Sequence, residues 1–161
     1  MVVISDTTAI TNLFQIGKIE ILQELYEEII IPMSVKNELD VIPAQKIFLE
    51  KVDWIKVEKV SSQSLKNKLL ETLDIGEAEA IALTIEKNAS LLIIDEKIGR
   101  EISKSYNLSI IGMLGVLIEA KEKKIISHIK PILDDLIGIA KFRIAPTLYK
   151  RVLQQTEENL D

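Results

Sequence analysis

The chain has no cysteine, a single histidine and few aromatic residues, and each shortage excludes a class of function. Without cysteine it can form neither a disulfide nor a thiolate metal site, and His128 alone cannot build a multi-histidine zinc site. Nor does one histidine, by itself, support a Ser-His-Asp triad. Aromatic residues make up 4% of the chain, too few for a platform that stacks several bases.

Other familiar signals are also missing. No apolar stretch approaches the length of a membrane span, and the first residues carry no positively charged leader. The glycine-rich dinucleotide fingerprint, the phosphate-binding P-loop, the serine-hydrolase elbow and the HExxH zinc motif are all absent. We therefore expect a soluble cytoplasmic protein that uses none of these chemistries and does not enter a membrane.

What the chain does have is abundant aliphatic material. Its 161 residues are 47% hydrophobic and 28% charged, which favours one folded domain over 1–161 and argues against disorder. The net charge is −5, but residues 1–96 carry nine basic and seventeen acidic side chains, whereas 97–151 carry eleven and five. The basic part suits one face of a nucleic-acid site, and it equally suits an ordinary solvated surface.

Short apolar runs alternate with segments of helical periodicity along the chain. Strands are expected at 2–5, 28–31, 54–57, 91–94 and 108–111, with 54–57 suited to a sheet edge. Helices are expected at 7–15, 19–26, 34–39, 41–51, 62–70, 75–87, 97–105, 112–122, 129–139 and 146–156, and residues 142–144 should be extended. This alternation predicts an α/β fold, a single-domain three-layer α/β/α sandwich around a parallel sheet.

Two acidic residues directly follow predicted buried strands. Asp6 comes after the apolar run at 2–5, and Asp95 comes after the run at 91–94. The carboxyl ends of parallel strands are where open α/β sheets place their ligand sites. Both carboxylates are therefore expected at one edge of the sheet.

Two further acids lie inside predicted helices, where a core-facing carboxylate is costly unless it is paired or bound to a metal. Glu38 lies beside a buried stripe, so an inward and a surface position fit it equally well. Glu77 and Glu79 are two residues apart and face different ways on a helix. Small alanine neighbours place Glu79 on the packed side, whereas Glu77 suits the first helical turn. We prefer Glu79 for the site, with Glu77 in support.

Neighbouring polar residues extend this pattern. Thr7 and Thr8 follow Asp6 at the first strand-to-helix turn, where a hydroxyl can bind the carboxylate or cap the helix. Arg100 follows Asp95 on the next helix and could meet a phosphate, or could simply face solvent. Carboxylates gathered at one edge favour a hard cation, either Mg²⁺ or Mn²⁺.

Together these segments resemble the PIN-domain nuclease superfamily, and within it the DUF3368 branch that adjoins the VapC-type toxins. Each motif is weak alone, but their order and spacing are specific, and the likeness spans nearly the whole chain. The matching segments are residues 3–8, 31–38, 73–83, 91–96, 111–117 and 142–144.

The resemblance implies a parallel-sheet sandwich with an acidic pocket that binds Mg²⁺ or Mn²⁺ and hydrolyses phosphodiester bonds, usually in RNA. It implies Asp6, Glu38, Glu79 and Asp95 as catalytic and metal-binding residues. Many members have Asp where this chain has Glu79. The resemblance also implies Thr8 as a supporting residue. Substrate phosphates need basic side chains around them, and we expect four residues of the basic segment 97–151 to supply these. These are Arg100, Lys104, Arg143 and Lys150.

Three functions remain open at this point. The first is an endoribonuclease, in the form of a toxin that is paired with a small antitoxin protein. The second is a catalytically weak or inactive PIN-like module that binds RNA or a protein partner. The third is a nuclease for structured DNA, although the chain is short for the helical arch that such enzymes use. A homodimer is also expected, through apolar segments at 16–25 and 114–118 that equally suit a core.

Overall fold

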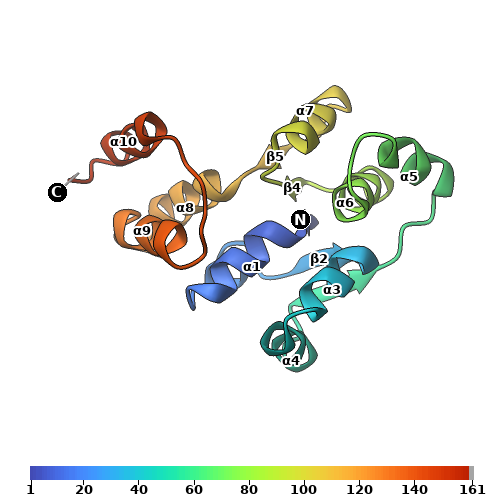
Figure 1. Ribbon diagram of the computed structural model, residues 1–161, viewed down its shortest axis with the longest axis horizontal. Helices are drawn as coiled ribbons and strands as arrows, with labels where there is room; N and C mark the ends of the chain where they lie inside the picture. Colours follow the sequence, from blue (N-terminus) through green and yellow to red (C-terminus); the bar gives the residue numbers. More distant parts are fainter. Residues whose placement is uncertain (160–161) are drawn as a thin grey trace.

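The computed structural model describes residues 1–159 and arranges their five strands as one parallel sheet (Figure 1). The order across the sheet is β3-β2-β1-β4-β5, with Ile4 paired to Ile30 on one side and Leu92 on the other. The predicted α/β/α fold class is confirmed, and β3 does lie at an edge. The strands are β1 (Val3–Ser5), β2 (Ile29–Pro32), β3 (Ile55–Glu58), β4 (Leu91–Ile93) and β5 (Ile110–Ile111).

Helices follow every strand, as the alternating pattern predicts. Asp74 caps the sixth helix, its Oδ1 accepting a 2.9 Å hydrogen bond from the Glu77 N–H. No helix among residues 1–159 is long and apolar enough to cross a membrane. The helices are α1 (Thr7–Gln15), α2 (Glu20–Tyr26), α3 (Met33–Asp40), α4 (Pro43–Lys51), α5 (Gln63–Leu70), α6 (Ile75–Glu86), α7 (Lys97–Ser105), α8 (Met113–Glu122), α9 (Lys130–Gly138) and α10 (Pro146–Gln155).

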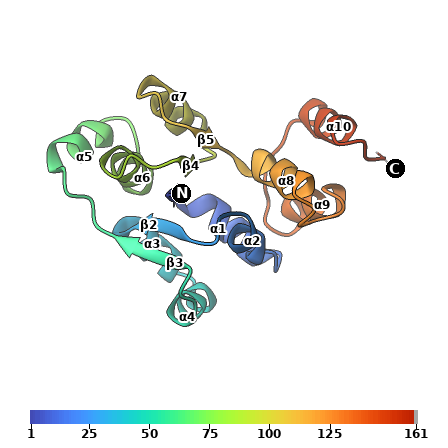
Figure 2. The ribbon, with the colours of Figure 1, turned by 180° about the vertical axis from the view of Figure 1, so that it is seen from behind.

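Alternate side chains of β1, β2 and β4 enter two separate cores. Ile4 and Leu92 pack into a core that α5, α6 and α7 complete, whereas Val3 and Ile93 pack toward α1, α2, α8 and α9. Figures 1 and 2 show the two helical layers on opposite faces of the sheet. Both faces of β1, β2 and β4 are covered, which explains why these strands lie in continuously apolar runs, whereas the edge strand β3 alternates.

The strand order places a topological switch point between β1 and β4. From β1 the chain moves to β2 and β3 on one side of the sheet, and then returns to β4 and β5 on the other. Because all strands are parallel, Asp6 and Asp95 leave the same edge on either side of this point. Such a crevice is the usual position for a ligand in open α/β folds.

Residues 142–144, which were expected to be extended, belong to no strand of the sheet. They form a coil between α9 and α10, and Phe142 is tied to the preceding helix by its N–H, which donates to the Leu136 carbonyl at 2.9 Å. The alternation of Phe142, Arg143 and Ile144 is therefore not that of a strand. Instead, all three side chains line a groove described below.

Candidate active site

Asp6 is the most buried carboxylate of the candidate site. Its side chain follows β1 directly, is only 3% exposed, and has one oxygen, Oδ1, without a hydrogen-bond partner. Burial raises its pKa to about 7, and the nearby Asp95 carboxylate adds to the rise, although the backbone N–H groups of Thr8 and Asp95 oppose it. A buried, unsatisfied carboxylate oxygen is costly, so a cation or proton is expected there.

Asp95 lies at the end of the neighbouring strand and is held from one side. Its Oδ1 accepts a 3.0 Å hydrogen bond from the Met113 N–H at the start of α8. Gly112 makes this approach possible, because a β-carbon there would lie 2.7 Å from Asp95 Oδ1 and 2.4 Å from a guanidinium nitrogen of Arg100. The loop before α8 thus packs against both a carboxylate and a cation.

A small cavity of about 200 Å³ opens beside Asp6 and is strongly acidic. The Thr7 hydroxyl donates to Glu38 Oε2, which fixes the carboxylate of α3 in the cavity wall. Glu77 has its pKa raised to about 8 by burial and by the neighbouring Asp74, with smaller contributions from Glu96 and Asp6. The cavity is lined by Asp6, Thr7, Thr8, Glu38, Asp74, Gly76, Glu77 and Glu96.

Glu79 does not line this cavity. Its Oε1 accepts a 3.0 Å hydrogen bond from the Ser34 N–H in the first turn of α3, and its Oε2 pairs with Lys66 of α5 at 2.8 Å. These partners outweigh the effect of burial and hold the pKa of Glu79 below its ordinary value. The carboxylate therefore ties together three helices, α3, α5 and α6.

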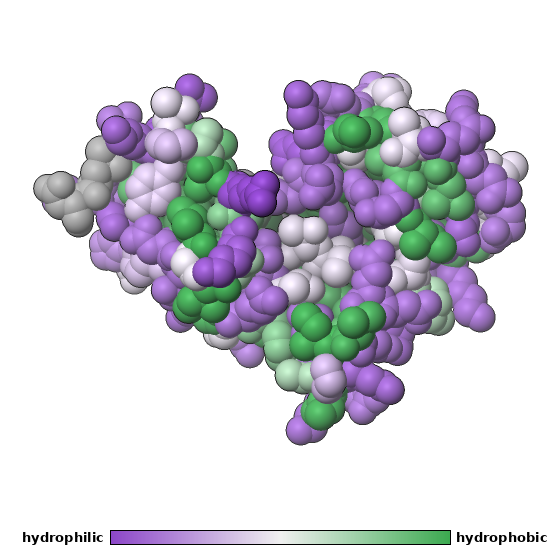
Figure 3. Space-filling view, viewed as in Figure 1, coloured by the Kyte–Doolittle hydropathy of each residue, from purple (hydrophilic) through white to green (hydrophobic). Residues whose placement is uncertain are grey.

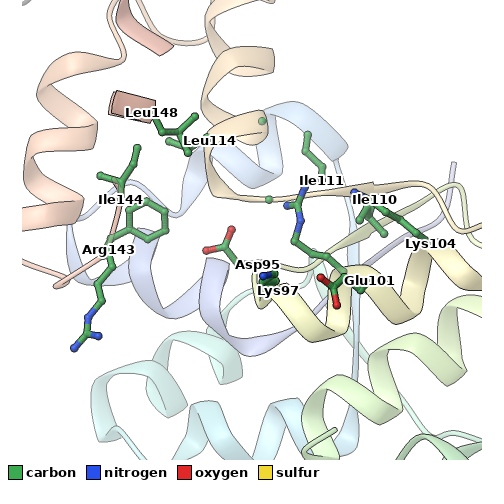
Figure 4. Close-up of a pocket in the computed structure, with 14 residues that line it drawn as sticks. Asp95, Lys97, Glu101, Lys104, Ile110, Ile111, Leu114, Arg143, Ile144 and Leu148 are labelled. Atoms are coloured by element: carbon green, nitrogen blue, oxygen red, sulfur yellow. The ribbon is translucent and has the colours of Figure 1, made fainter. Parts of the chain in front are cut away.

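A larger groove of about 720 Å³ begins at Asp95 (Figure 4). Four basic side chains line it, Lys97, Arg100, Lys104 and Arg143, against the two acids Asp95 and Glu101. Figure 3 shows it as a notch between the α7 side and the α10 side of the molecule. Lys150 is not among the lining residues. The apolar part of the lining is formed by Ile110, Ile111, Leu114, Phe142, Ile144 and Leu148.

The acidic cavity and the basic groove meet at the end of β4. Asp95 lines the groove, and the next residue, Glu96, lines the cavity. The charge of Asp95 also raises the pKa of Asp6. Figure 4 shows the Asp95 carboxylate between Arg143 on one side and Lys97 on the other. An anionic chain held in the basic groove would therefore pass directly beside the acids.

The carboxylates of the acidic cavity and Asp95 are of a type that binds divalent cations, although they are not already arranged around a metal position. Among residues 1–159, no three acidic or histidine side chains are grouped closely enough to hold a metal as they stand. Mg²⁺ needs no such group, since it keeps several waters and is commonly bound through one or two carboxylates and substrate phosphates. The free Oδ1 of Asp6 and the raised pKa values of Asp6 and Glu77 show carboxylates that lack a compensating positive charge.

A parallel sheet with an acidic crevice at its switch point is an arrangement of nuclease type. The family model DUF3368, described as a PIN domain, matches residues 2–158, and the chain belongs to that PIN-domain family. PIN domains are generally nucleases that use divalent metals, so a nucleic acid is the implied substrate. No curated protein matches the chain.

Sequence reasoning did not anticipate that Asp74 and Glu96 line the cavity. Both stand at helix N-caps, Asp74 before α6 and Glu96 before α7. An acidic residue is common at an N-cap because it interacts favourably with the helix dipole, so its presence there does not indicate a second role. Their positions in the chain could have indicated this second role, because each N-cap residue follows a segment that returns to the carboxyl edge of the sheet.

Proposed function

We propose that the protein is a metal-dependent endoribonuclease that hydrolyses phosphodiester bonds in RNA. The proposed metal-binding and catalytic acids are Asp6, Glu38, Glu77 and Asp95. Glu77 takes the place that the sequence pattern favoured for Glu79, because Glu77 lines the acidic cavity while Glu79 is paired with Lys66.

The proposed reaction depends on both the acidic cavity and the basic groove. Bound Mg²⁺ or Mn²⁺ would polarise the phosphoryl oxygen, acidify a water and stabilise the leaving oxygen. Asp6 and Asp95 would hold it from neighbouring strand ends, with Thr8 supporting Asp6 through its N–H. Thr7 keeps Glu38 in place, so that this acid can orient the attacking water.

The substrate would be held by the basic groove. Arg100, Lys104 and Arg143 line it on two sides, so they can contact successive phosphates of one strand. The single observation that carries the proposal is the unsatisfied Oδ1 of buried Asp6 beside Asp95, where the acidic cavity and this groove meet.

The test is cleavage of a panel of single-stranded and structured RNAs, with DNAs of the same sequences. We expect cleavage of RNA with Mn²⁺ or Mg²⁺, loss of cleavage in EDTA, and recovery when metal is restored. Asp6→Asn protein purified in parallel controls for contaminating nuclease. Cleavage that persists in EDTA, or that is equal with Asp6→Asn, would contradict the proposal.

The alternative is a module that binds RNA or a protein partner and cleaves weakly or not at all. The observation that favours it is the ion pair between Lys66 and Glu79, which removes one acid from the candidate set. RNA binding by folded wild-type protein, without cleavage of any panel member in Mn²⁺, would support this alternative.

We also propose, from the family likeness alone, a cytoplasmic toxin that acts as a homodimer and is inhibited by a small antitoxin protein. Ile19 and Leu22 of the first apolar segment, and Val116 and Leu117 of the second, are buried in the core. These side chains cannot form a dimer interface without unfolding. Light scattering at several concentrations would measure the oligomeric state.

A further inference from the structure

The basic groove has one wall that no strand supports. Its floor is formed by β5 and the start of α8, and one wall is α7. The opposite wall consists of Phe142, Arg143 and Ile144 in the coil before α10, together with Leu148 in the first turn of α10. In Figure 1 α10 lies at the far end of the molecule from α5. The wall is held to α9 at Phe142, and its other end depends on how α10 is attached.

A carboxylate near the end of the described chain supplies much of that attachment. Glu158, just after α10, has a side chain that is only 2% exposed. Its Oε2 accepts hydrogen bonds from the Ile129 N–H at 2.7 Å and from Lys121 Nζ at 2.9 Å, and its Oε1 accepts from the Lys130 N–H at 2.9 Å. All three donors lie on other segments, so the contact joins α10 to α8 and α9.

The chemistry makes this a strong contact. The N-cap residue of α9, Ile129, has no side chain that can cap the helix, and Glu158 satisfies the exposed N–H groups in its place. A carboxylate is also favoured at the positive end of a helix dipole, and hydrogen bonds to an ionised acceptor are stronger than neutral ones. These contacts hold the pKa of Glu158 below its ordinary value despite its burial.

Apolar packing and two further hydrogen bonds also attach α10. Val152 and Leu153 are its buried apolar residues, and the Tyr149 hydroxyl donates to Asp134 of α9 at 2.5 Å. Lys121 also donates to the Thr156 carbonyl at the end of α10. The polar anchors of α10 therefore include one at its first turns and a cluster around Glu158 at its end.

We propose that Glu158 is a positioning residue for the substrate groove, which keeps α10 and the wall at 142–148 docked so that Arg143 stays in the groove lining. It touches neither the acids nor the substrate. Its loss would loosen the wall and weaken substrate binding, while the acids keep their geometry. This consequence for RNA rests on the proposed function, but the anchoring role does not.

The experiment compares Glu158→Gln with Glu157→Gln in the full chain, because Glu157 is the adjacent, exposed residue of the same charge. Hydrogen–deuterium exchange is expected to become at least roughly tenfold faster over 142–156 in Glu158→Gln only, with α6 unchanged. For RNA cleavage, KM should rise about three- to tenfold while kcat stays within about twofold.

Unchanged exchange over 142–156 in Glu158→Gln would overturn the proposal, and so would a fall in kcat with KM unchanged. If Glu158→Gln fails to fold, Lys121→Met replaces it, because the two backbone donors to Glu158 remain. That variant should speed exchange over the same segment to a smaller extent, and unchanged exchange in it would also overturn the proposal. A wild-type protein that cleaves no RNA would remove the proposed function alone, since exchange still measures the anchor.

Discussion

Lys66 Nζ lies 2.8 Å from Glu79 Oε2, and this ion pair holds the carboxylate at the junction of α3, α5 and α6. Glu77, two residues earlier on the same helix, instead lines the acidic cavity. Two glutamates of the same helix thus have separate environments. Glu79 is neutralised within the protein, whereas burial and the neighbouring Asp74 raise the pKa of Glu77.

Substituting these two glutamates should give opposite results. Glu79→Gln leaves Lys66 without its partner and should lower the free energy of unfolding by roughly 1–3 kcal/mol, with Mn²⁺ affinity nearly unchanged. Glu77→Gln removes an unfavourable charge, so it should stabilise the metal-free protein and weaken Mn²⁺ binding. Urea denaturation and calorimetric titration measure the two effects. Equal losses of Mn²⁺ affinity in both variants would contradict the assignment.

The metal-free protein should lose stability as the pH rises from about 5 to 8. Asp6 and Glu77 have folded-state pKa values of about 7 and about 8, above their ordinary values of 3.8 and 4.5. A carboxyl group with a raised pKa contributes stability below its unfolded-state value, and that contribution disappears as the pH passes the folded-state value. The lowered pKa values of Glu79, Asp134 and Glu158 act in a different window, since their contributions are lost only below about pH 4.5.

Thermal unfolding in EDTA should therefore show a midpoint that falls by on the order of 5–10 °C across this range. Asp6→Asn and Glu77→Gln should each flatten the slope. Added Mn²⁺ should raise the midpoint more at pH 8 than at pH 5, because only the ionised carboxylates bind it. A midpoint that rises with pH in EDTA would show that these acids are not buried together.

Gly76→Ala should separate site geometry from stability. A β-carbon at Gly76 would lie 2.5 Å from Glu38 Oε1, so the flexible Glu38 carboxylate must move out of its place. The helix itself should gain roughly 0.5–1 kcal/mol from the replacement of glycine. We expect an equal or higher unfolding midpoint with weaker Mn²⁺ binding.

Gly138→Ala is the matched control, because nothing lies within 4 Å of a β-carbon built at that helical glycine. It should leave Mn²⁺ affinity unchanged. Unchanged affinity in Gly76→Ala as well would show that the position of Glu38 does not matter to the metal.

Arg143→Gln should weaken RNA binding through the loss of a phosphate contact. Arg143 lines the groove, whereas Arg151 of α10 is exposed and does not line it, so Arg151→Gln is the control. Filter binding at several salt concentrations should show a several-fold rise in Kd for Arg143→Gln. The slope of log K against log salt should fall by about one unit or slightly less. The same slope in both variants would place the RNA elsewhere.

Local sequence signals were sufficient for the elements of this fold. Helix 7–15 was predicted from its periodicity after Asp6, and α1 has these bounds. The apolar runs located all five strands, although β5 is shorter than its run because residues 108 and 109 precede the ladder. Residues 142–144 were predicted to be extended, and they lie outside the sheet; a short pattern does not say whether a neighbouring strand is available for pairing.

The candidate site was less accessible to sequence reasoning. The end of a buried strand fixes where a residue such as Asp6 or Asp95 emerges, so these two positions follow from topology. On a helix, the choice between Glu77 and Glu79 depends on how α6 is rotated against its neighbours. The partners of Glu79 are Lys66 on α5 and the Ser34 N–H on α3, and both are distant from it in sequence. That information is tertiary, and periodicity alone does not contain it.

The most direct measurement is the Mn²⁺-dependent cleavage rate of one RNA substrate by wild-type protein, Asp6→Asn and Asp53→Asn. Asp53 is an exposed aspartate just before β3, at the opposite edge of the sheet from the site. The account predicts a loss on the order of 10²-fold or more for Asp6→Asn, with a folded protein, and wild-type activity for Asp53→Asn. Cleavage by Asp6→Asn at a rate close to that of the wild type would contradict the central claim.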